Sequence, residues 1–172
     1  LFVTQRGVLG FGVSTGGSGH IKLRGVGGDR ASAVLMMVDG QPQFAGIYSH
    51  QISDFYSKEY VECVEVLRGP GAVLYGSNAM AGVINVITKR PSHEGVHTSM
   101  SVRGGSYNTW QAAATNTVKF GKFSSLISGG YDHTDGTAEG FSFNQAYGYG
   151  KLNYEFSSHW QGAADYTITN FK

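Results

Sequence analysis

The pattern of hydrophobic and polar residues changes near Pro91. Before this residue, short apolar runs alternate with glycine-rich loops, and after it apolar and polar residues alternate with a period of two. Short runs rich in β-branched residues are typical of buried strands, whereas strict alternation is typical of strands that have one apolar face. The pattern therefore predicts two parts with different architectures.

The first part is predicted to be a small mixed α/β domain. Its four buried-type strands are HIKLRG, SAVLMMVDG, YVECVEVLRG and GVINVITKR. A short helix is predicted over Ala72 to Tyr75, because Pro70 would occupy an early helical position in which its missing N–H costs nothing. The only cysteine, Cys63, lies in the apolar run VECVEV and is predicted to be a small buried residue. A reactive thiol would need a basic or metal-containing surrounding, and none is visible in the sequence.

The second part is predicted to hold about five antiparallel strands. These strands are VHTSMSVR, TWQAAATNTVKF, KFSSLISGGYDH, YGKLNYEF and WQGAADYTIT, and the third alternates less cleanly because Leu126 falls on the polar face. Each approaches the roughly 9–11 residues of a tilted membrane-spanning strand, whereas soluble strands usually have about 5–6. Aromatic residues near the strand ends would match the aromatic bands of membrane barrels. They are Tyr107, Trp110, Phe120, Phe123, Tyr131, Phe156 and Trp160.

The connections between these strands differ in length. FGK and SSH are very short, while DHTDGTAEGFSFNQ is long, polar and rich in glycine. If the strands form a meander, short and long connections fall at alternate ends, as in outer-membrane barrels, and only the short GGSYN departs from this rule. A soluble antiparallel sandwich with one wet face is the alternative that periodicity leaves open.

Composition and charge narrow the choice of partners. The net charge of +1 gives no electrostatic reason to expect a nucleic acid, and a single cysteine excludes an internal disulfide. No apolar run approaches the 18 or so residues that a membrane helix needs. The chain begins at LFVTQRG without a methionine and stops within the alternating run YTITNFK, which suggests a fragment or a processed piece.

Two motifs resemble catalytic sites but lack the required context. GAVLYGSN has the glycine spacing of a phosphate-binding loop, but Ser77 and Asn78 stand where that chemistry needs Lys and Ser or Thr. HEGVH matches a zinc-hydrolase motif, which requires a helix. Pro91, Gly95 and the alternating pattern favour an extended chain, in which His93 and His97 lie roughly 13 Å apart, too far for one zinc ion. We therefore predict no enzymatic activity, no resident metal and no cofactor.

The glycine-rich stretch VEVLRGPGAVLYGSNAMAGVINVITK resembles the end of the plug domain of TonB-dependent outer-membrane receptors. The family pattern there is E-V-x-R-G-P followed by L-Y-G-x-x-A-x-G-G-V-I-N-I-x-T. IKLRGVGGDRASAVLMMVDGQP is similar to the earlier I-R-G and V-D-G-x-P segments of the plug, in the same order and spacing. The resemblance covers about Gly19 to Arg90. It departs from the family at Ala81, where glycine is common, and at Cys63, where a polar residue is common.

The resemblance implies an α+β plug domain over residues 1–92, truncated at its N-terminus, with a small mixed four-stranded sheet and short helices. Residues 93–172 would then be the first five or so antiparallel strands of a transmembrane barrel of about 22 strands that encloses the plug. Because an open edge in lipid would leave backbone groups unsatisfied, five strands would be an incomplete barrel. The junction near residues 89–95 would face the periplasm.

The family also implies a function. It implies energised uptake of a scarce, bulky nutrient across the bacterial outer membrane, with a ferric siderophore as the first candidate and cobalamin or a glycan as the alternatives. The implied partners are TonB with its inner-membrane energising complex, and outer-membrane lipid. A non-transporting barrel, an adhesin or a receptor remnant is an alternative of a different class.

Site residues are carried over from the family by position. Arginines that match Arg24 and Arg68 pair with barrel glutamates and lock the plug, although a solvated arginine at each strand end is the simpler alternative. The loop after Gly40 would rise to the plug apex, where aromatic rings can stack on a ligand and His50 can donate a hydrogen bond. The ligand-binding candidates are Gln43, Phe44, Tyr48, Ser49 and His50, with ordinary loop packing as the alternative.

Overall fold

The computed structural model describes residues 2–3, 21–23, 34–43, 57–69, 71–76 and 79–172. The chain divides into two compact units. The first comprises Leu1–Tyr56 and Val61–Thr88, and the second comprises Ser57–Tyr60 and Lys89–Lys172. A short segment, Ser57–Tyr60, is thus separated in sequence from the rest of the unit to which it belongs.

The first unit contains a mixed four-stranded sheet, as predicted. Its order is β4–β3–β6–β5, in which only the central pair β3 and β6 is parallel. These strands are β3 (Val34–Val38), β4 (Gln41–Pro42), β5 (Val61–Arg68) and β6 (Gly82–Thr88), and the predicted short helix is α1 (Ala72–Tyr75). Among the described residues, no helix is long enough to cross a membrane.

One predicted strand lies outside this sheet. Ile21–Lys22 forms β2, which pairs antiparallel with β1 (Phe2–Val3) in a separate two-stranded sheet. The fourth place is taken by β4, because Asp39 and Gly40 both have positive φ values, 47° and 84°, and reverse the chain directly after β3. Such a two-residue turn with two positive φ angles is what a hairpin requires.

The core of the first unit lies on both faces of β3 and β6. All five residues of β3 are buried. One cluster is formed by Leu23, Val34, Met36, Val38, Ala81, Ile84 and Val86, and a second by Leu35, Met37, Ala79 and Val83. A strand covered on both sides reads as a continuous apolar run rather than as an alternation, which explains SAVLMMV.

The predicted burial of Cys63 is wrong, because its side chain is exposed. Strand β5 is an edge strand, and its register shifts between Val61 and Cys63. Only Val61 and Val66 pack against the core cluster. Cys63 alternates onto the opposite side with Glu65 and Leu67, so its apolar neighbours in the sequence do not cover it.

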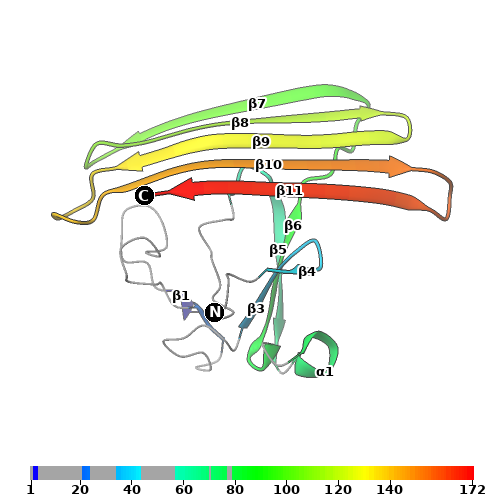
Figure 1. Cartoon of the computed structure of the whole chain (residues 1–172), viewed down its shortest axis with the longest axis horizontal. Coiled ribbons are helices and arrows are strands. Elements are labelled where there is room, and N and C mark those ends of the chain that lie inside the picture. Colours follow the sequence, from blue (N-terminus) through cyan, green and yellow to red (C-terminus); the bar gives the residue numbers. More distant parts are fainter. Residues whose placement is uncertain (1, 4–20, 24–33, 44–56, 70, 77–78) are drawn as a thin grey trace. The chain divides into compact units, whose positions relative to one another are not determined.

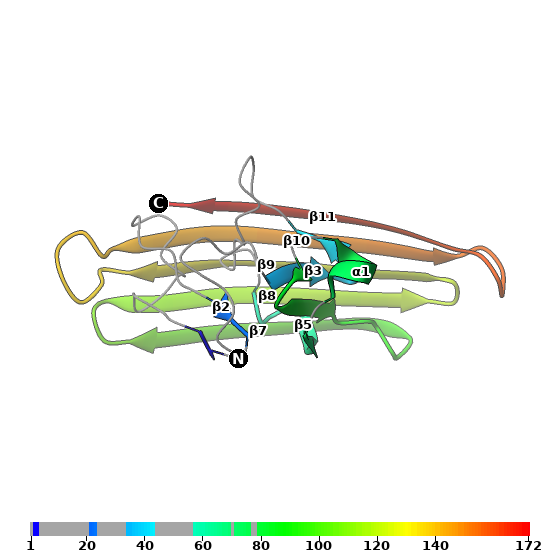
Figure 2. The ribbon, with the colours of Figure 1, turned by 90° about the horizontal axis from the view of Figure 1, so that it is seen from below.

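The second unit is a five-stranded antiparallel meander (Figure 1), as predicted. Its strands are β7 (Gly95–Gly105), β8 (Thr109–Phe120), β9 (Phe123–Thr134), β10 (Phe143–Glu155) and β11 (Gln161–Phe171). The β7–β8 turn and the longer β9–β10 loop lie at one end, and the β8–β9 and β10–β11 turns lie at the other (Figure 2). The alternation of connections therefore matches the prediction.

The two faces of this sheet differ in chemistry. The apolar face is exposed and carries large side chains such as Met100, Val102 and Tyr166, which are 79%, 82% and 70% exposed. Aromatic residues mark both its ends, with Trp110 stacked on Tyr131 at one end and Phe120 beside Phe123 at the other. The polar face comprises the alternate residues, among them Ser99, Ser101, Arg103, Gln111, Thr115, Ser128, Asp132 and Lys151. Leu126 belongs to the polar face, as the sequence pattern indicates, and is buried.

Candidate functional site

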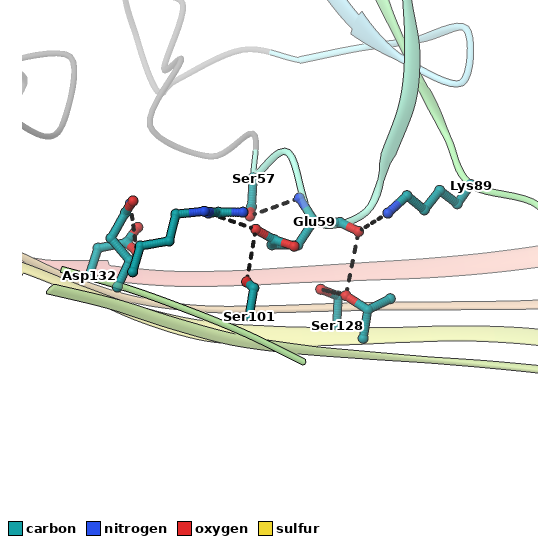
Figure 3. Close-up of polar contacts among 9 residues, drawn as sticks. Ser57, Glu59, Lys89, Ser101, Ser128 and Asp132 are labelled. Carbon is teal, nitrogen blue, oxygen red and sulfur yellow. Dashed lines mark hydrogen bonds and ion pairs between the residues drawn. The ribbon is translucent and has the colours of Figure 1, made fainter. Parts of the chain in front are cut away.

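The segment Ser57–Tyr60 is bound to the polar face of the five-stranded sheet (Figure 3). The carboxylate of Glu59 accepts hydrogen bonds from Arg103 Nη1 at 3.1 Å and from Ser101 Oγ at 3.3 Å, both on β7. The Glu59 side chain is 17% exposed and that of Arg103 is 44% exposed. Solvent therefore weakens this ion pair, and it contributes about 1 kcal/mol rather than the larger value of a fully desolvated pair.

The backbone of Glu59 is held as firmly as its side chain. Its carbonyl oxygen accepts hydrogen bonds from Lys89 Nζ at 2.7 Å and from Thr115 Oγ1 at 3.4 Å. Thr115 is in turn paired with Ser128 at 2.8 Å, so that β8 and β9 support the contact. We call Glu59 with Ser101, Arg103, Thr115 and Lys89 the Glu59 clamp.

Tyr60 adds an aromatic contact next to the Glu59 clamp. Its ring is 2% exposed and stacks on Tyr149 of β10, with centroids 4.4 Å apart and an interplanar angle of 16°. Burial raises the pKa of the Tyr60 phenol to about 12, because the charged phenolate would lose its hydration. The Tyr60 carbonyl oxygen accepts a hydrogen bond from the Lys89 N–H at 2.8 Å.

A small residue on β9 makes room for a second tyrosine of the polar face. A Cβ added at Gly130 would lie 2.5 Å from the Tyr147 hydroxyl oxygen and 2.8 Å from the Ala112 carbonyl oxygen. Tyr147 can therefore lie across β9 only because residue 130 has no side chain. In this position its side chain interacts with that of Ser57.

A separate polar network joins the β3–β4 turn to β6 in the first unit. Asp39 accepts hydrogen bonds from the Thr88 N–H and hydroxyl at 3.0 and 2.6 Å. Asn85 accepts one from the Gly40 N–H at 3.0 Å and donates one to Glu65 at 3.2 Å. The turn that precedes the predicted ligand-binding loop is thus fixed to the strand that ends at the junction with the second unit.

Only two of the site residues expected from the family lie within the described residues. Gln43 follows β4 and is half-buried, with its N–H bound to the Met36 carbonyl oxygen at 2.9 Å. Arg68 ends β5 and is exposed. Among the residues that the structure describes, its guanidinium has no hydrogen-bond or ion-pair partner. The remaining candidates, which are Arg24, Phe44, Tyr48, Ser49 and His50, lie outside the described residues.

The motif that resembles a zinc-hydrolase site does not form catalytic geometry. Ser77 and Asn78 of the phosphate-loop-like stretch lie outside the described residues. His97 lies in β7 and His93 in the non-helical segment before it, so the helix that the zinc motif requires is absent between them. No group of three or more metal-binding side chains occurs among the described residues.

The sequence analysis missed the Glu59 clamp. Glu59 lies in the short polar segment SKEY before β5, where nothing distinguishes it from a solvated loop residue. The strands that Glu59 contacts did carry a signal in the sequence. Arg103 and Asp132 are charged residues at positions of the alternating strands that face away from the apolar side, and a charge on such a face calls for a partner.

The comparisons with known proteins agree with this architecture. Residues 3–83 match the family model described as the TonB-dependent receptor plug domain. The siderophore receptor PirA from Pseudomonas aeruginosa is 26% identical at a TM-score of 0.63, with 86% of this chain and 28% of that chain covered. The pyoverdine outer membrane receptor FpvA from Pseudomonas aeruginosa PAO1, bound to pyoverdine, is 16% identical at a TM-score of 0.77, with 97% and 23% covered.

A third solved structure widens the range of cargo among the relatives. The copper transporter OprC is 16% identical at a TM-score of 0.76, with 99% of this chain and 26% of that chain covered. This chain thus spans about a quarter of the length of each of the three proteins. The match of residues 3–83 to the plug-domain family model identifies the first unit as a TonB-dependent receptor plug domain, and the antiparallel strands that follow resemble in fold those of the solved receptors.

Proposed function

We propose that this chain is the plug and the first barrel strands of an outer-membrane receptor that takes up a ferric siderophore with energy supplied through TonB. The observation that carries the proposal is the covalent continuity of a plug-type unit with five strands of 11–13 residues that have one apolar and one polar face. Strands of this length with aromatic bands at both ends suit a lipid bilayer.

The proposed division of the chain is a plug over residues 1–92 and barrel strands over residues 93–172. It is supported by the change of pattern near Pro91 and by the start of β7 at Gly95. The segment Ser57–Tyr60 is the exception, since it belongs by its contacts to the second unit. We infer that this segment is held on the polar face of the five-stranded sheet through Glu59 and Tyr60.

The proposed ligand is a chelated ferric ion. Two of the compared receptors are described as siderophore or pyoverdine receptors, and the third as a copper transporter, so metal cargo is the shared chemistry. We assign ligand contact to Gln43, Phe44, Tyr48, Ser49 and His50 in the loop that follows β4. We assign Arg24 and Arg68 to pairing with barrel carboxylates. The exposure of Arg68 at the end of β5 supports this assignment.

The test is nutrient uptake by the complete receptor. The whole gene is expressed in cells that lack their own siderophore receptors, and growth under iron limitation is measured with a panel of ferric siderophores. We expect growth with at least one of them, and loss of that growth when TonB is deleted. Growth that depends instead on cobalamin, a glycan or copper ions would replace the proposed cargo. The absence of both binding and uptake for every ligand would favour a non-transporting barrel.

A further inference from the structure

The chain leaves the second unit after Tyr60 and returns to it at Lys89, and these two residues are in direct contact. The Lys89 N–H donates to the Tyr60 carbonyl oxygen at 2.8 Å, and Lys89 Nζ donates to the Glu59 carbonyl oxygen at 2.7 Å. Directly beyond this point, Val61 pairs with Thr88 as the first rung of the antiparallel β5–β6 ladder. The stretch Val61–Thr88 is therefore a loop whose two ends are fastened together.

The same point is fixed to β7, β8 and β10 of the five-stranded sheet. Glu59 contacts β7 through Arg103 and Ser101 and contacts β8 through Thr115 (Figure 3). Tyr60 stacks on Tyr149 of β10. These strands are joined by continuous ladders over their full length. A load applied to Glu59 is thus shared by many backbone hydrogen bonds.

The geometry determines how a pull from the N-terminal side would act. Without the Glu59 clamp, tension at Ser57 would reach the β5–β6 ladder at its open end, where Val61 and Thr88 are adjacent. Hydrogen bonds loaded from one end of an antiparallel ladder break one rung at a time, which is the weakest way to load such a pair. With the Glu59 clamp in place, the tension passes into β7 and β8 before it reaches β5.

We propose that Glu59 is a force-bearing anchor that stops the unravelling of the plug at Ser57–Tyr60 and keeps the β5–β6 loop folded while the preceding residues are extracted. This inference rests on the proposed function, because a pull on the N-terminal side is what TonB would supply. The anchor restricts how much of the plug moves during transport, and Glu59 acts by holding the chain rather than by contacting the ligand.

The test is to pull the complete receptor, held in a lipid bilayer, from its N-terminus and to record the released length. In the unchanged receptor we expect unravelling to stop before Ser57. In Glu59→Ala, which keeps the backbone contacts of residue 59 and the Tyr60 stack, we expect the stop to yield at a lower force. The released length then increases by about 90–100 Å, which is the extended length of residues 61–88. The exchange Glu59→Arg with Arg103→Glu should restore the stop, because it rebuilds the ion pair with reversed charges.

Glu62→Ala is the matched control, because Glu62 is an exposed acidic residue three positions away on β5. Unravelling of this variant should stop at the same released length as in the unchanged receptor. The inference is overturned if the unchanged receptor unravels through Thr88 without a pause, or if Glu59→Ala and Glu62→Ala withstand the same force before residues 61–88 are released. The charge exchange guards against a misfolded single variant, since it must fold to restore the stop.

A second measurement uses the native cysteine. Cys63 is opposite Ile87 in the β5–β6 ladder, and the spacing of such cross-strand partners suits a disulfide. In Ile87→Cys, a disulfide to Cys63 would lock β5 to β6, and we expect uptake to continue after oxidation. Loss of uptake that returns on reduction would show that the loop must open and would overturn the inference. The pulling experiment needs no ligand. If the receptor shows no uptake but its unravelling still stops before Ser57, the proposed function is contradicted and the inference about Glu59 is not.

Discussion

Asp39 and Thr88, 49 positions apart in the sequence, are joined by two hydrogen bonds through both oxygens of one carboxylate. Asp39 lies in the turn after β3 with a φ of 47°, and Thr88 is the fully buried last residue of β6. The contact fastens the start of the proposed ligand-binding loop to the strand that ends at the junction. A displacement of one would therefore be transmitted to the other.

Replacing Asp39 by alanine should destabilise the plug by about 2–3 kcal/mol, because it leaves the buried Thr88 donors without this acceptor. Calorimetric unfolding of the complete receptor measures the change. Asp39→Asn is the control, since asparagine tolerates the positive φ and keeps one acceptor oxygen, and it should cost less. Equal unfolding of both variants and the unchanged receptor would contradict this role.

Replacing Tyr60 by alanine should weaken the attachment of Ser57–Tyr60 by about 3 kcal/mol, which is typical for the loss of a large buried aromatic side chain. Tyr60→Phe keeps the stack on Tyr149 and should cost much less. Protease cleavage within the segment measures the difference, with Tyr60→Ala cleaved faster. Equal cleavage of the two variants would show that the stack does not hold the segment.

The stability of the attached segment Ser57–Tyr60 should depend on alkaline pH through the Tyr60 phenol. Burial raises its pKa from 10.0 to about 12, so its neutral form is favoured in the attached segment. The attachment is therefore fully stable below pH 10 and loses stability as the pH rises from 10 towards 12. Phenolate absorbance of the complete receptor, compared with Tyr60→Phe, should show one tyrosine titrating late. A difference spectrum that titrates near pH 10 would contradict the burial.

Gly130→Ala should destabilise the strands, because the new Cβ would collide with the Tyr147 hydroxyl and the Ala112 carbonyl oxygen. We expect a loss of about 1–3 kcal/mol, as for other overpacked sites. Gly150→Ala on β10 is the matched control, since a Cβ there meets no atom within 4 Å. Thermal unfolding compares the two variants, and a Gly130 variant as stable as the Gly150 variant would refute the packing argument.

Arg68→Ala should loosen the plug in the complete receptor, if Arg68 pairs with a barrel carboxylate as proposed. Removal of one partner leaves a buried charge uncompensated, which costs about 3–5 kcal/mol in a fully buried pair and less in an exposed one. The measurements are plug unfolding and ligand uptake. Arg90→Ala provides the control, because Arg90 is also exposed but lies outside the strands. If plug unfolding and ligand uptake are both unchanged in Arg68→Ala, the proposed pairing of Arg68 with a barrel carboxylate is wrong.

Much of the fold was predictable because its signals are local. The continuous apolar run of β3 reports burial on both faces, and the alternation in β8 reports one apolar and one polar face. These features depend only on neighbours along the chain, so periodicity reveals them without knowledge of the rest.

Other features were decided only by the tertiary structure. Glu59 meets Arg103 across 44 positions, and no local pattern indicates which inward-facing charge will find which partner. Cys63 is exposed because a register shift on an edge strand turns it away from the core, although its neighbours in the sequence are apolar. Alternation along a strand determines which residues share a face. Which segment covers that face depends on how distant parts of the chain come together, and this is where the Glu59 clamp arises.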